Sequence, residues 1–199
     1  GEKILFISDR SGGDNLWTLE LATGDTAQIT QGNGGRWVSP DWTPDGDYVV
    51  ASKGATRLGV VRLWIGHVDG GSGVELHKEP ANLQTLGGAV SRDGRYIWYA
   101  RRTGSWQYNA TFPQYQIGYY DRETGQDYPR SFRYGSAFRP TLSPDGRWLV
   151  FGTRHEDQTG LRIRELETGE ERWLAYPVQH DDQESIADQD VLPGMSFTP

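Results

Sequence analysis

Histidine and carboxylate side chains gather near the carboxyl-terminal end of this chain, where they could bind a metal ion. His180 is followed by Asp181 and Asp182, with Glu184 and Asp188 close behind. Carboxylate-rich loops can bind Ca²⁺, which takes six or more oxygen ligands. The spacing matches no EF-hand loop, however, and a run of charges usually forms a solvated surface. We therefore predict a polar surface loop without a metal, since the segment has no apolar face.

Nucleophilic catalysis would need a serine or cysteine activated by a histidine that a carboxylate orients. The chain contains no cysteine and no Gly-x-Ser-x-Gly segment. Ser105 follows Gly104, but the residues that flank this pair do not fit the pattern. We therefore predict no catalytic, cofactor-binding or metal-binding residue, and no enzymatic activity of this chain on its own. Membership of a larger hydrolase is a separate question that these residues do not decide.

Aromatic residues in a long polar segment are the best candidates for binding a partner. Residues 101–114 (RRTGSWQYNATFPQ) separate two predicted strands and form a longer connection than their counterparts. Exposed aromatic side chains supply contact area at small entropic cost. Alternatively, the segment folds back and its aromatic residues cover the core. The predicted partner-binding residues, one of them from the polar loop 155–157, are Trp106, Tyr108, Phe112, Arg101, Arg102 and His155.

The overall composition argues against several classes of protein. The formal net charge is −7 and the only basic cluster is a pair of arginines, whereas nucleic-acid binding needs many cations to neutralise phosphates. The sequence contains no apolar stretch that could span a membrane and no signal peptide. The 26 glycines, 10 prolines, 8 tryptophans and 10 tyrosines stand among short β-branched stretches, which is typical of an all-β chain.

A repeated turn motif, Ser/Thr-Pro-Asp-Gly, organises the whole chain. It begins at Thr43 and Ser143, a variant begins at Ser91, and Thr198 begins a truncated copy, which gives intervals of 48, 52 and 55 residues. Such a period suits one four-stranded unit per repeat. Proline presets φ at the first corner, aspartate can bond the downstream backbone, and glycine takes the left-handed corner. The aspartates interpreted as turn residues rather than catalytic carboxylates are Asp45, Asp93 and Asp145.

Strands follow each turn in a constant order. Each repeat continues with a first strand, a polar loop, a second strand, a tight glycine turn and a short outer strand. Glycine suits such hairpin turns because it accepts positive φ. The predicted first strands cover residues 2–7, 47–52, 95–100 and 147–152, and the second strands cover 15–21, 61–68, 115–121 and 161–166. The tryptophans expected to pack between sheets, rather than to stack on sugars, are Trp17, Trp42, Trp64, Trp98, Trp148 and Trp173.

The repeat resembles that of the TolB-type, WD-like β-propeller, which is also seen in tricorn-type proteases. Residues 40–46 (PDWTPDG) and 140–146 (PTLSPDG) match the family pattern, and the repeat covers nearly the whole chain. The resemblance implies one all-β propeller domain over residues 1–199 with about four four-stranded antiparallel blades. The implied blades cover 1–30 with 194–199, 36–78, 86–132 and 137–177, with a linker over 178–193. A periplasmic or otherwise extracytoplasmic location is also implied.

The last third of the chain has a narrower resemblance. Residues 143–185 and 190–199 are similar to the propeller region ahead of the catalytic barrel in large bacterial metal-dependent amidohydrolases. The metal ligands of that barrel include a His-x-His pair, which none of the four histidines here can form. This resemblance therefore implies a non-catalytic part of such a protein. The histidines are His67, His77, His155 and His180.

The two ends of the chain fall within one copy of the turn motif. Gly1 corresponds to the motif glycine and Thr198 to its Ser/Thr, so the first blade lacks its innermost strand, the one that precedes the motif, and residues 194–198 supply a spare one. Propellers can close by pairing such a strand with the first blade, which removes two exposed edges. We predict that Phe197 pairs beside Leu5, either within one chain or across a homodimer that forms an eight-bladed ring. Alternatively, the chain is a fragment of a larger propeller.

These observations favour a non-catalytic β-propeller scaffold for protein–protein or interdomain interaction. The expected partner is a protein or an adjacent catalytic domain, with no nucleic acid and no membrane span. A second hypothesis is an accessory propeller that gates substrate for a larger hydrolase, either an amidohydrolase or a tricorn-like peptidase. A third is binding of a small molecule or glycan in the central channel, because the scaffold by itself does not determine function.

Overall fold

A computed structural model describes residues 1–33, 35–55, 60–77, 80–102, 115–156, 158–180 and 195–198. The described residues form β-strands, turns and loops without a helix, so the prediction of an all-β chain is confirmed. The chain divides into two compact units, Gly1–Gly88 and Ala89–Pro199. A single domain over the whole chain stays a prediction.

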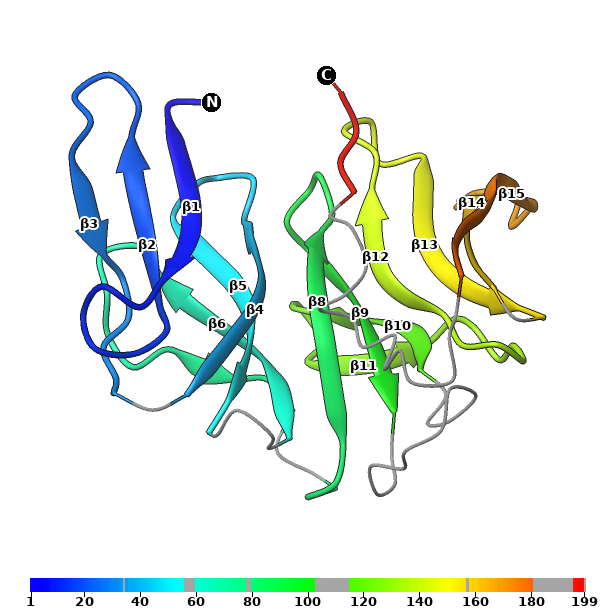
Figure 1. The fold of residues 1–199 in the computed structure, drawn as a ribbon, viewed down its shortest axis with the longest axis horizontal. Coiled ribbons are helices and arrows are strands. Elements are labelled where there is room, and N and C mark those ends of the chain that lie inside the picture. The colour runs from blue at the N-terminus through cyan, green and yellow to red at the C-terminus, as the bar shows by residue number, and fades with distance from the viewer. Residues whose placement is uncertain are drawn as a thin grey trace. The chain divides into compact units, whose positions relative to one another are not determined.

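The first unit contains two antiparallel sheets (Figure 1). The first sheet has three strands in the order β1-β2-β3, and the second has four in the order β4-β5-β6-β7. The strands are β1 (Lys3–Ser8), β2 (Asn15–Glu20), β3 (Thr26–Gln28), β4 (Arg36–Trp42), β5 (Tyr48–Gly54), β6 (Val61–His67) and β7 (Val74–Glu75).

The second unit carries two four-stranded antiparallel sheets, in the orders β8-β9-β10-β11 and β12-β13-β14-β15. Strand β8 begins in the first unit and ends in the second. The strands are β8 (Gln84–Val90), β9 (Tyr96–Arg102), β10 (Gln116–Asp121), β11 (Gln126–Pro129), β12 (Phe138–Leu142), β13 (Trp148–His155), β14 (Gln158–Glu165) and β15 (Glu171–His180). The four predicted repeats therefore correspond to four sheets.

The prediction for residues 178–180 near the end of the chain needs correction. Strand β15 runs to His180, so the start of the predicted linker and of the predicted surface loop is strand. Among the described residues β1 pairs with β2 alone, and residues 195–198 belong to no strand. Met195, Ser196 and Phe197 instead line a pocket with side chains of the fourth sheet, including Leu161. Pairing of Phe197 beside Leu5, within one chain or across a dimer, stays a prediction, because the two residues belong to different units.

The repeated turn works as predicted. In the third repeat the Ser91 hydroxyl donates to Asp93 Oδ1 over 2.5 Å and accepts from the Tyr96 amide over 2.8 Å. Asp93 Oδ1 also accepts from the Arg95 amide, and Gly94 has a φ of 73°. Equivalent hydroxyl–carboxylate bonds occupy the second and fourth repeats. The interpretation of these aspartates as turn residues is confirmed.

The first strand of each four-stranded sheet has a residue of positive φ at one equivalent place. The residue four positions before the motif Ser/Thr has positive φ in all three, namely Ser39 (50°), Gly87 (74°) and Arg139 (56°). In β4 and β12 the register shifts around this residue. Bulges re-aim side chains and increase twist. Burial also lowers the pKa of the Arg139 guanidinium.

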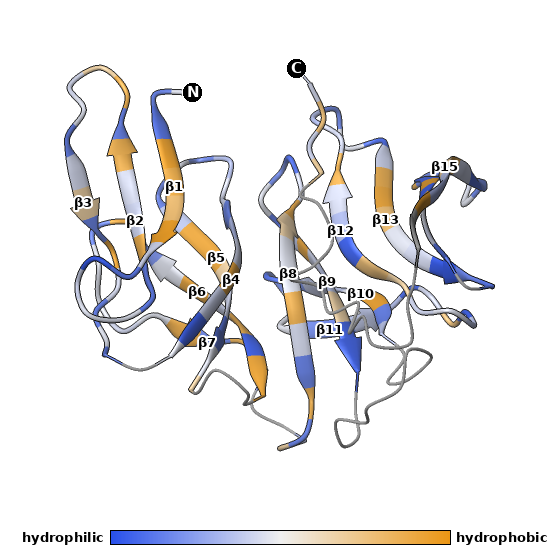
Figure 2. Cartoon of the chain, viewed as in Figure 1, coloured by the Kyte–Doolittle hydropathy of each residue, from blue (hydrophilic) through white to orange (hydrophobic). Residues whose placement is uncertain are grey.

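Each unit has its own aromatic-rich core. In the first, Trp37 and Trp64 meet edge to face with ring centroids 4.8 Å apart, and Figure 2 shows hydrophobic residues along β1 and β5 of this unit. In the second, Trp98 packs with Leu149 and Phe151. The predicted core role is thus confirmed for Trp64 and Trp98. Arginine guanidinium groups cover three half-buried tryptophans: Trp17, Trp148 and Trp173.

An ion pair joins the start of β9 to the end of β10. Arg95 donates from Nε and Nη2 to both carboxylate oxygens of Asp121, over 3.1 and 2.7 Å. The Asp121 side chain is only 4% exposed, and the arginine lowers its pKa to about 2. Arg95 also meets Glu123 over 2.8 Å, but Glu123 is 66% exposed. The buried member of this pair therefore carries the pH dependence.

We predict that Asp121→Asn lowers the melting temperature at pH 7 but not near pH 2. A carboxylate whose pKa is depressed on folding stabilises the fold above its unfolded pKa of about 4, and the stabilisation is lost as pH falls towards 2. Melting curves of the variant and the parent chain should therefore converge between pH 4 and 2. Glu123→Gln is the matched control and should shift melting little, because exposed ion pairs contribute about 0–1 kcal/mol. A constant gap between Asp121→Asn and the parent chain at all pH values would contradict the prediction.

Candidate functional site

The predicted partner-binding residues separate into three groups in the structure. Trp106, Tyr108 and Phe112 lie outside the described residues. Arg101 and Arg102 end strand β9, and Arg102 is only 4% exposed with its guanidinium 5.2 Å from the Tyr115 ring centre. A direct contact between Arg102 and a partner is therefore not favoured, whereas the role of half-buried Arg101 stays a prediction.

His155 lies in an exposed aromatic cluster that the sequence analysis did not anticipate. Its ring centre is 5.9 Å from that of Trp173 and 5.7 Å from that of Tyr176. The Tyr176 hydroxyl donates to the His155 carbonyl over 3.0 Å. Gly160 makes room for both aromatic rings, since a Cβ there would lie 2.7 Å from Tyr176 and 2.8 Å from Trp173. His155 and Arg102 thus contact different residues.

The most exposed aromatic side chains stand on the connection between β11 and β12. Phe132 is 86% exposed and Tyr134 is 81% exposed, more than any other large hydrophobic residue in the described part of the chain. The backbone between them belongs to Arg133, whose side chain turns inward. Its guanidinium lies 5.4 Å from the Phe151 ring centre and Nη1 donates to Glu171 over 2.5 Å. Side chains therefore alternate outward, inward and outward along this loop.

The Gln116 side chain forms two hydrogen bonds with the backbone of Arg133, the middle residue of this loop. Its Nε2 donates to the Arg133 carbonyl over 2.8 Å, and its Oε1 accepts from the Arg133 amide over 3.0 Å. The same Oε1 accepts from the Ser131 hydroxyl, which in turn accepts from the Ile117 amide. The loop is thus joined to β10 on both sides of Phe132.

The end of the loop is joined to β13. The Arg154 amide donates to the Gly135 carbonyl over 2.8 Å, and the Thr153 hydroxyl donates to the Ser136 carbonyl over 2.7 Å. Gly135 has a φ of 89°, and a Cβ there would lie 2.1 Å from the Arg154 carbonyl oxygen. Only glycine fits this position. The loop therefore presents its two aromatic side chains from a backbone held at three places.

This site could not be found by looking for long or unusual loops. The segment RSFRYG (130–135) is short, and its aromatic residues resemble core residues of the neighbouring strands. The available signal was the alternation Phe-Arg-Tyr followed by glycine and serine, which breaks the strand pattern before β12 begins. The predicted loop 101–114 connects β9 to β10, and the Gln116 clamp stands at the start of β10. Gln116 pairs with Arg101, so the clamp and the end of β9 lie at the same end of the third sheet.

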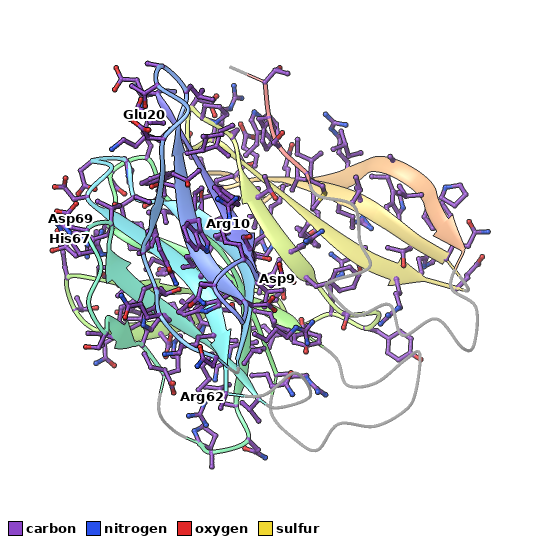
Figure 3. The ribbon with its side chains drawn as sticks, turned by 60° about the vertical axis from the view of Figure 1, so that its left-hand side comes forward. Asp9, Arg10, Glu20, Arg62, His67 and Asp69 are labelled. Atoms are coloured by element: carbon purple, nitrogen blue, oxygen red, sulfur yellow. The ribbon has the colours of Figure 1, made fainter. Side chains whose placement is uncertain are left out.

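Charged residues of the first unit are paired locally. Figure 3 shows His67 and Asp69 side by side, with His67 Nδ1 3.5 Å from Asp69 Oδ2. Arg62, at the other end of β6, meets Glu75 over 2.9 Å and donates to the carbonyls of Ala81 and Leu83. The contacts of Arg62 stabilise the second sheet and its connection to β8.

The described residues form neither a cluster of metal ligands nor a membrane-spanning helix. Within the described ranges, no three histidine, aspartate or glutamate side chains lie close enough to share a metal ion. The carboxylates that follow His180, from Asp181 to Asp188, fall outside those ranges. The described part of the chain contains no helix that could span a lipid bilayer.

Comparison with known proteins identifies the fold. No protein-family model matches the sequence, and no curated protein matches it. Among solved structures, TolB from Acinetobacter baumannii has a TM-score of 0.70 at 20% identity, covering 90% of this chain and 42% of its own. An oligogalacturonate lyase in complex with manganese has a TM-score of 0.61 at 19% identity, covering 85% of this chain and 43% of its own. A puromycin-hydrolysing peptidase from Mycobacterium tuberculosis has a TM-score of 0.64 at 17% identity, covering 88% of this chain and 27% of its own.

These similarities confirm the predicted TolB-type propeller fold. The chain forms a partial β-propeller of about four blades, one of them with three strands in the described residues. It spans less than half the length of each of these three proteins. The neighbours include both a TolB and enzymes, so the fold is compatible with a scaffold or an accessory domain and does not choose between them.

We predict that Gly135→Ala destabilises the protein more than Gly24→Ala does. Both glycines have positive φ, 89° and 77°, where an alanine costs about 1–2 kcal/mol. Only Gly135 is crowded, since nothing lies within 4 Å of a Cβ at Gly24. The difference should be about 1–3 kcal/mol, the usual cost of overpacking, measured by urea unfolding. Equal losses for the two variants would show that the loop is not held against β13.

Proposed function

We propose that this chain is a non-catalytic propeller scaffold that binds a protein partner through the loop 131–136. The single observation that carries the proposal is the pair of aromatic side chains, Phe132 and Tyr134, displayed at 86% and 81% exposure. Large aromatic residues at the centre of interfaces contribute a disproportionate share of binding energy. Exposed apolar side chains that lie close together often mark protein interaction sites.

The rigidity of the loop supports the same conclusion. Hydrogen bonds to Gln116, Thr153 and Arg154 hold the backbone on both sides of the aromatic pair. A binding loop that is already ordered loses little conformational entropy on association. The neighbouring ion pair between Arg133 and Glu171 keeps the only charge of the segment turned away from the aromatic side chains. The resulting surface suits a partner with an apolar pocket.

A second candidate function is an accessory propeller of a larger hydrolase. It is supported by the similarity to the M. tuberculosis peptidase, of which this chain matches only 27%. The sequence resemblance to amidohydrolase propellers is a further reason to consider it. In that case the aromatic pair would contact a catalytic domain of the same polypeptide. The coding sequence beyond Pro199 in the natural gene distinguishes these functions, because a barrel or peptidase domain there would favour the second.

The interaction can be tested by replacing Phe132 or Tyr134 with benzoylphenylalanine and irradiating the chain in an extract of its source cells. We expect one discrete cross-linked protein from both positions, identified by mass spectrometry and then purified. Its affinity for Phe132→Ala/Tyr134→Ala should fall by roughly 10-fold or more, since each hot-spot truncation costs above about 1 kcal/mol. Leu21→Ala is the control, because Leu21 is a 54% exposed apolar residue of the first unit.

Three outcomes of this experiment are informative. Equal cross-linking from position 21 would contradict the proposal, as would unchanged affinity of the double alanine variant. Cross-linking to a second copy of this chain would identify a homodimer, which light scattering of the parent chain and the double variant should then distinguish. A melting temperature equal to that of the parent chain would show that the double variant is folded.

A further inference from the structure

The buried guanidinium of Arg102 has no polar partner in the described part of the chain. Arg102 is the last residue of β9, and its side chain belongs to a residue that is only 4% exposed. Neither Nε nor Nη1 has a hydrogen-bond acceptor among the described residues, although both atoms are buried, and the side chain forms no ion pair there. A buried charge without a partner is strongly unfavourable, so this group requires an explanation.

The contact that Arg102 does make is with an aromatic ring. Its guanidinium carbon lies 5.2 Å from the centre of the Tyr115 ring, and Tyr115 packs with Ala100 and Phe138. The Tyr115 amide donates to the Ser136 hydroxyl over 2.7 Å, so the ring is fixed close to the start of β12. The π face of a ring attracts a cation, yet the contact leaves the Nε–H and Nη1–H groups of Arg102 unpaired.

The buried and half-buried carboxylates of the described second unit are all paired with other arginines. The connection that follows Arg102, residues 103–114, contains no aspartate or glutamate. The partner of Arg102 is therefore neither one of these paired carboxylates nor an acid of the adjoining connection. The paired carboxylates are Asp121 with Arg95, Glu165 with Arg147, and Glu171 with both Arg133 and Arg162.

Two further arginines add positive charge near the same aromatic residues. The Arg154 guanidinium carbon lies 5.7 Å from the centre of the Phe138 ring, and Arg139 follows Phe138 along β12. Burial lowers the pKa of the Arg139 guanidinium, and no carboxylate offsets this effect. Glu156, next to the end of β13, is exposed. The surroundings of Arg102 therefore combine aromatic rings with an excess of positive charge.

The repeated fold does not itself require a cation at this place. Arg102 is the eighth residue after the motif glycine, and the equivalent residues are Asp9 in the first repeat, Gly54 in the second and Arg154 in the fourth. A residue that the end of the strand needs for its geometry would recur in every repeat. The two arginines, both in the second unit, therefore serve something other than the folding of a repeat.

We propose that Arg102 binds the carboxylate of a small organic molecule whose apolar part contacts Tyr115. A carboxylate can accept from two N–H groups of one guanidinium, so one ligand group satisfies donors that the described residues leave unpaired. The low dielectric of a buried position strengthens this attraction, and the aromatic surroundings favour an organic acid over an inorganic anion. Burial disfavours a protein partner but suits a ligand of few atoms. The test does not depend on the interaction proposed for the loop 131–136.

The test uses the 199-residue chain and three probes: phenylacetate, its neutral analogue phenylacetamide, and inorganic phosphate. We expect phenylacetate to raise the melting temperature saturably, because a ligand that binds only the folded state stabilises it. Its affinity should exceed that of phenylacetamide by about five-fold or more, because a charged acceptor bonds a guanidinium more strongly than a neutral one does. In the ¹⁵N-labelled chain, the NMR shifts should centre on the Arg102 Nε–H group and the Tyr115 amide.

Two substitutions connect the binding to Arg102. Arg102→Met should abolish the response to phenylacetate and leave the ligand-free melting temperature equal or higher, because an apolar side chain removes the cost of an unpaired buried charge. Arg95→Met is the matched control. It removes the partner of buried Asp121, so it should lower the melting temperature but keep the response to phenylacetate.

Several outcomes would overturn the proposal. A lower ligand-free melting temperature of Arg102→Met would show that the protein itself pairs this arginine. Equal stabilisation by phenylacetamide, tighter binding of phosphate than of phenylacetate, or no saturable response to phenylacetate would exclude a carboxylate site. The three probes decide the matter on the parent chain even if a variant does not fold.

Discussion

One hydrogen bond, from a serine or threonine hydroxyl to an aspartate two residues later, organises every described turn of the repeated motif. It measures 2.5 Å at Thr43–Asp45, Ser91–Asp93 and Ser143–Asp145. The same hydroxyl accepts the amide five residues on, so a single side chain joins the end of one strand to the start of the next. Because strand register follows from turn geometry, the packing of both cores depends on this bond.

A second constraint is the way this chain covers its aromatic residues. No lysine follows Lys78, and the basic side chains of the second unit are therefore all arginine. Guanidinium groups lie over Tyr96, Tyr115, Phe138, Trp148, Phe151 and Trp173. Arginine is weakly hydrated and planar, so it can cover an aromatic face and still reach a carboxylate. This explains how half-buried aromatic residues can stay at sheet edges. Phe132 and Tyr134 differ from them in being 86% and 81% exposed.

The repeat made much of the fold predictable, because each copy restates the same local chemistry. The role of Asp93 and the position of β9 follow from residues that are close in sequence. Exposure of Phe132 could not be predicted in this way, since it depends on where Gln116 holds the loop backbone. Burial of Arg102 depends likewise on Tyr115, which precedes β10. The position of Phe197 in a pocket that Leu161 also lines was missed because strand pairing was inferred from the motif alone.

The locality of the turn bond also has a kinetic consequence. Each sheet is formed from strands that are consecutive in the chain, and the turn that starts it closes over five residues. Proteins whose contacts are close in sequence fold faster than those that must first close long loops, and β-rich chains are usually slow for the latter reason. In repeat proteins, folding can begin at any unit and propagate to its neighbours. We therefore expect the polypeptide to acquire its sheets one after another as it leaves the ribosome, each formed before the next repeat has been synthesised.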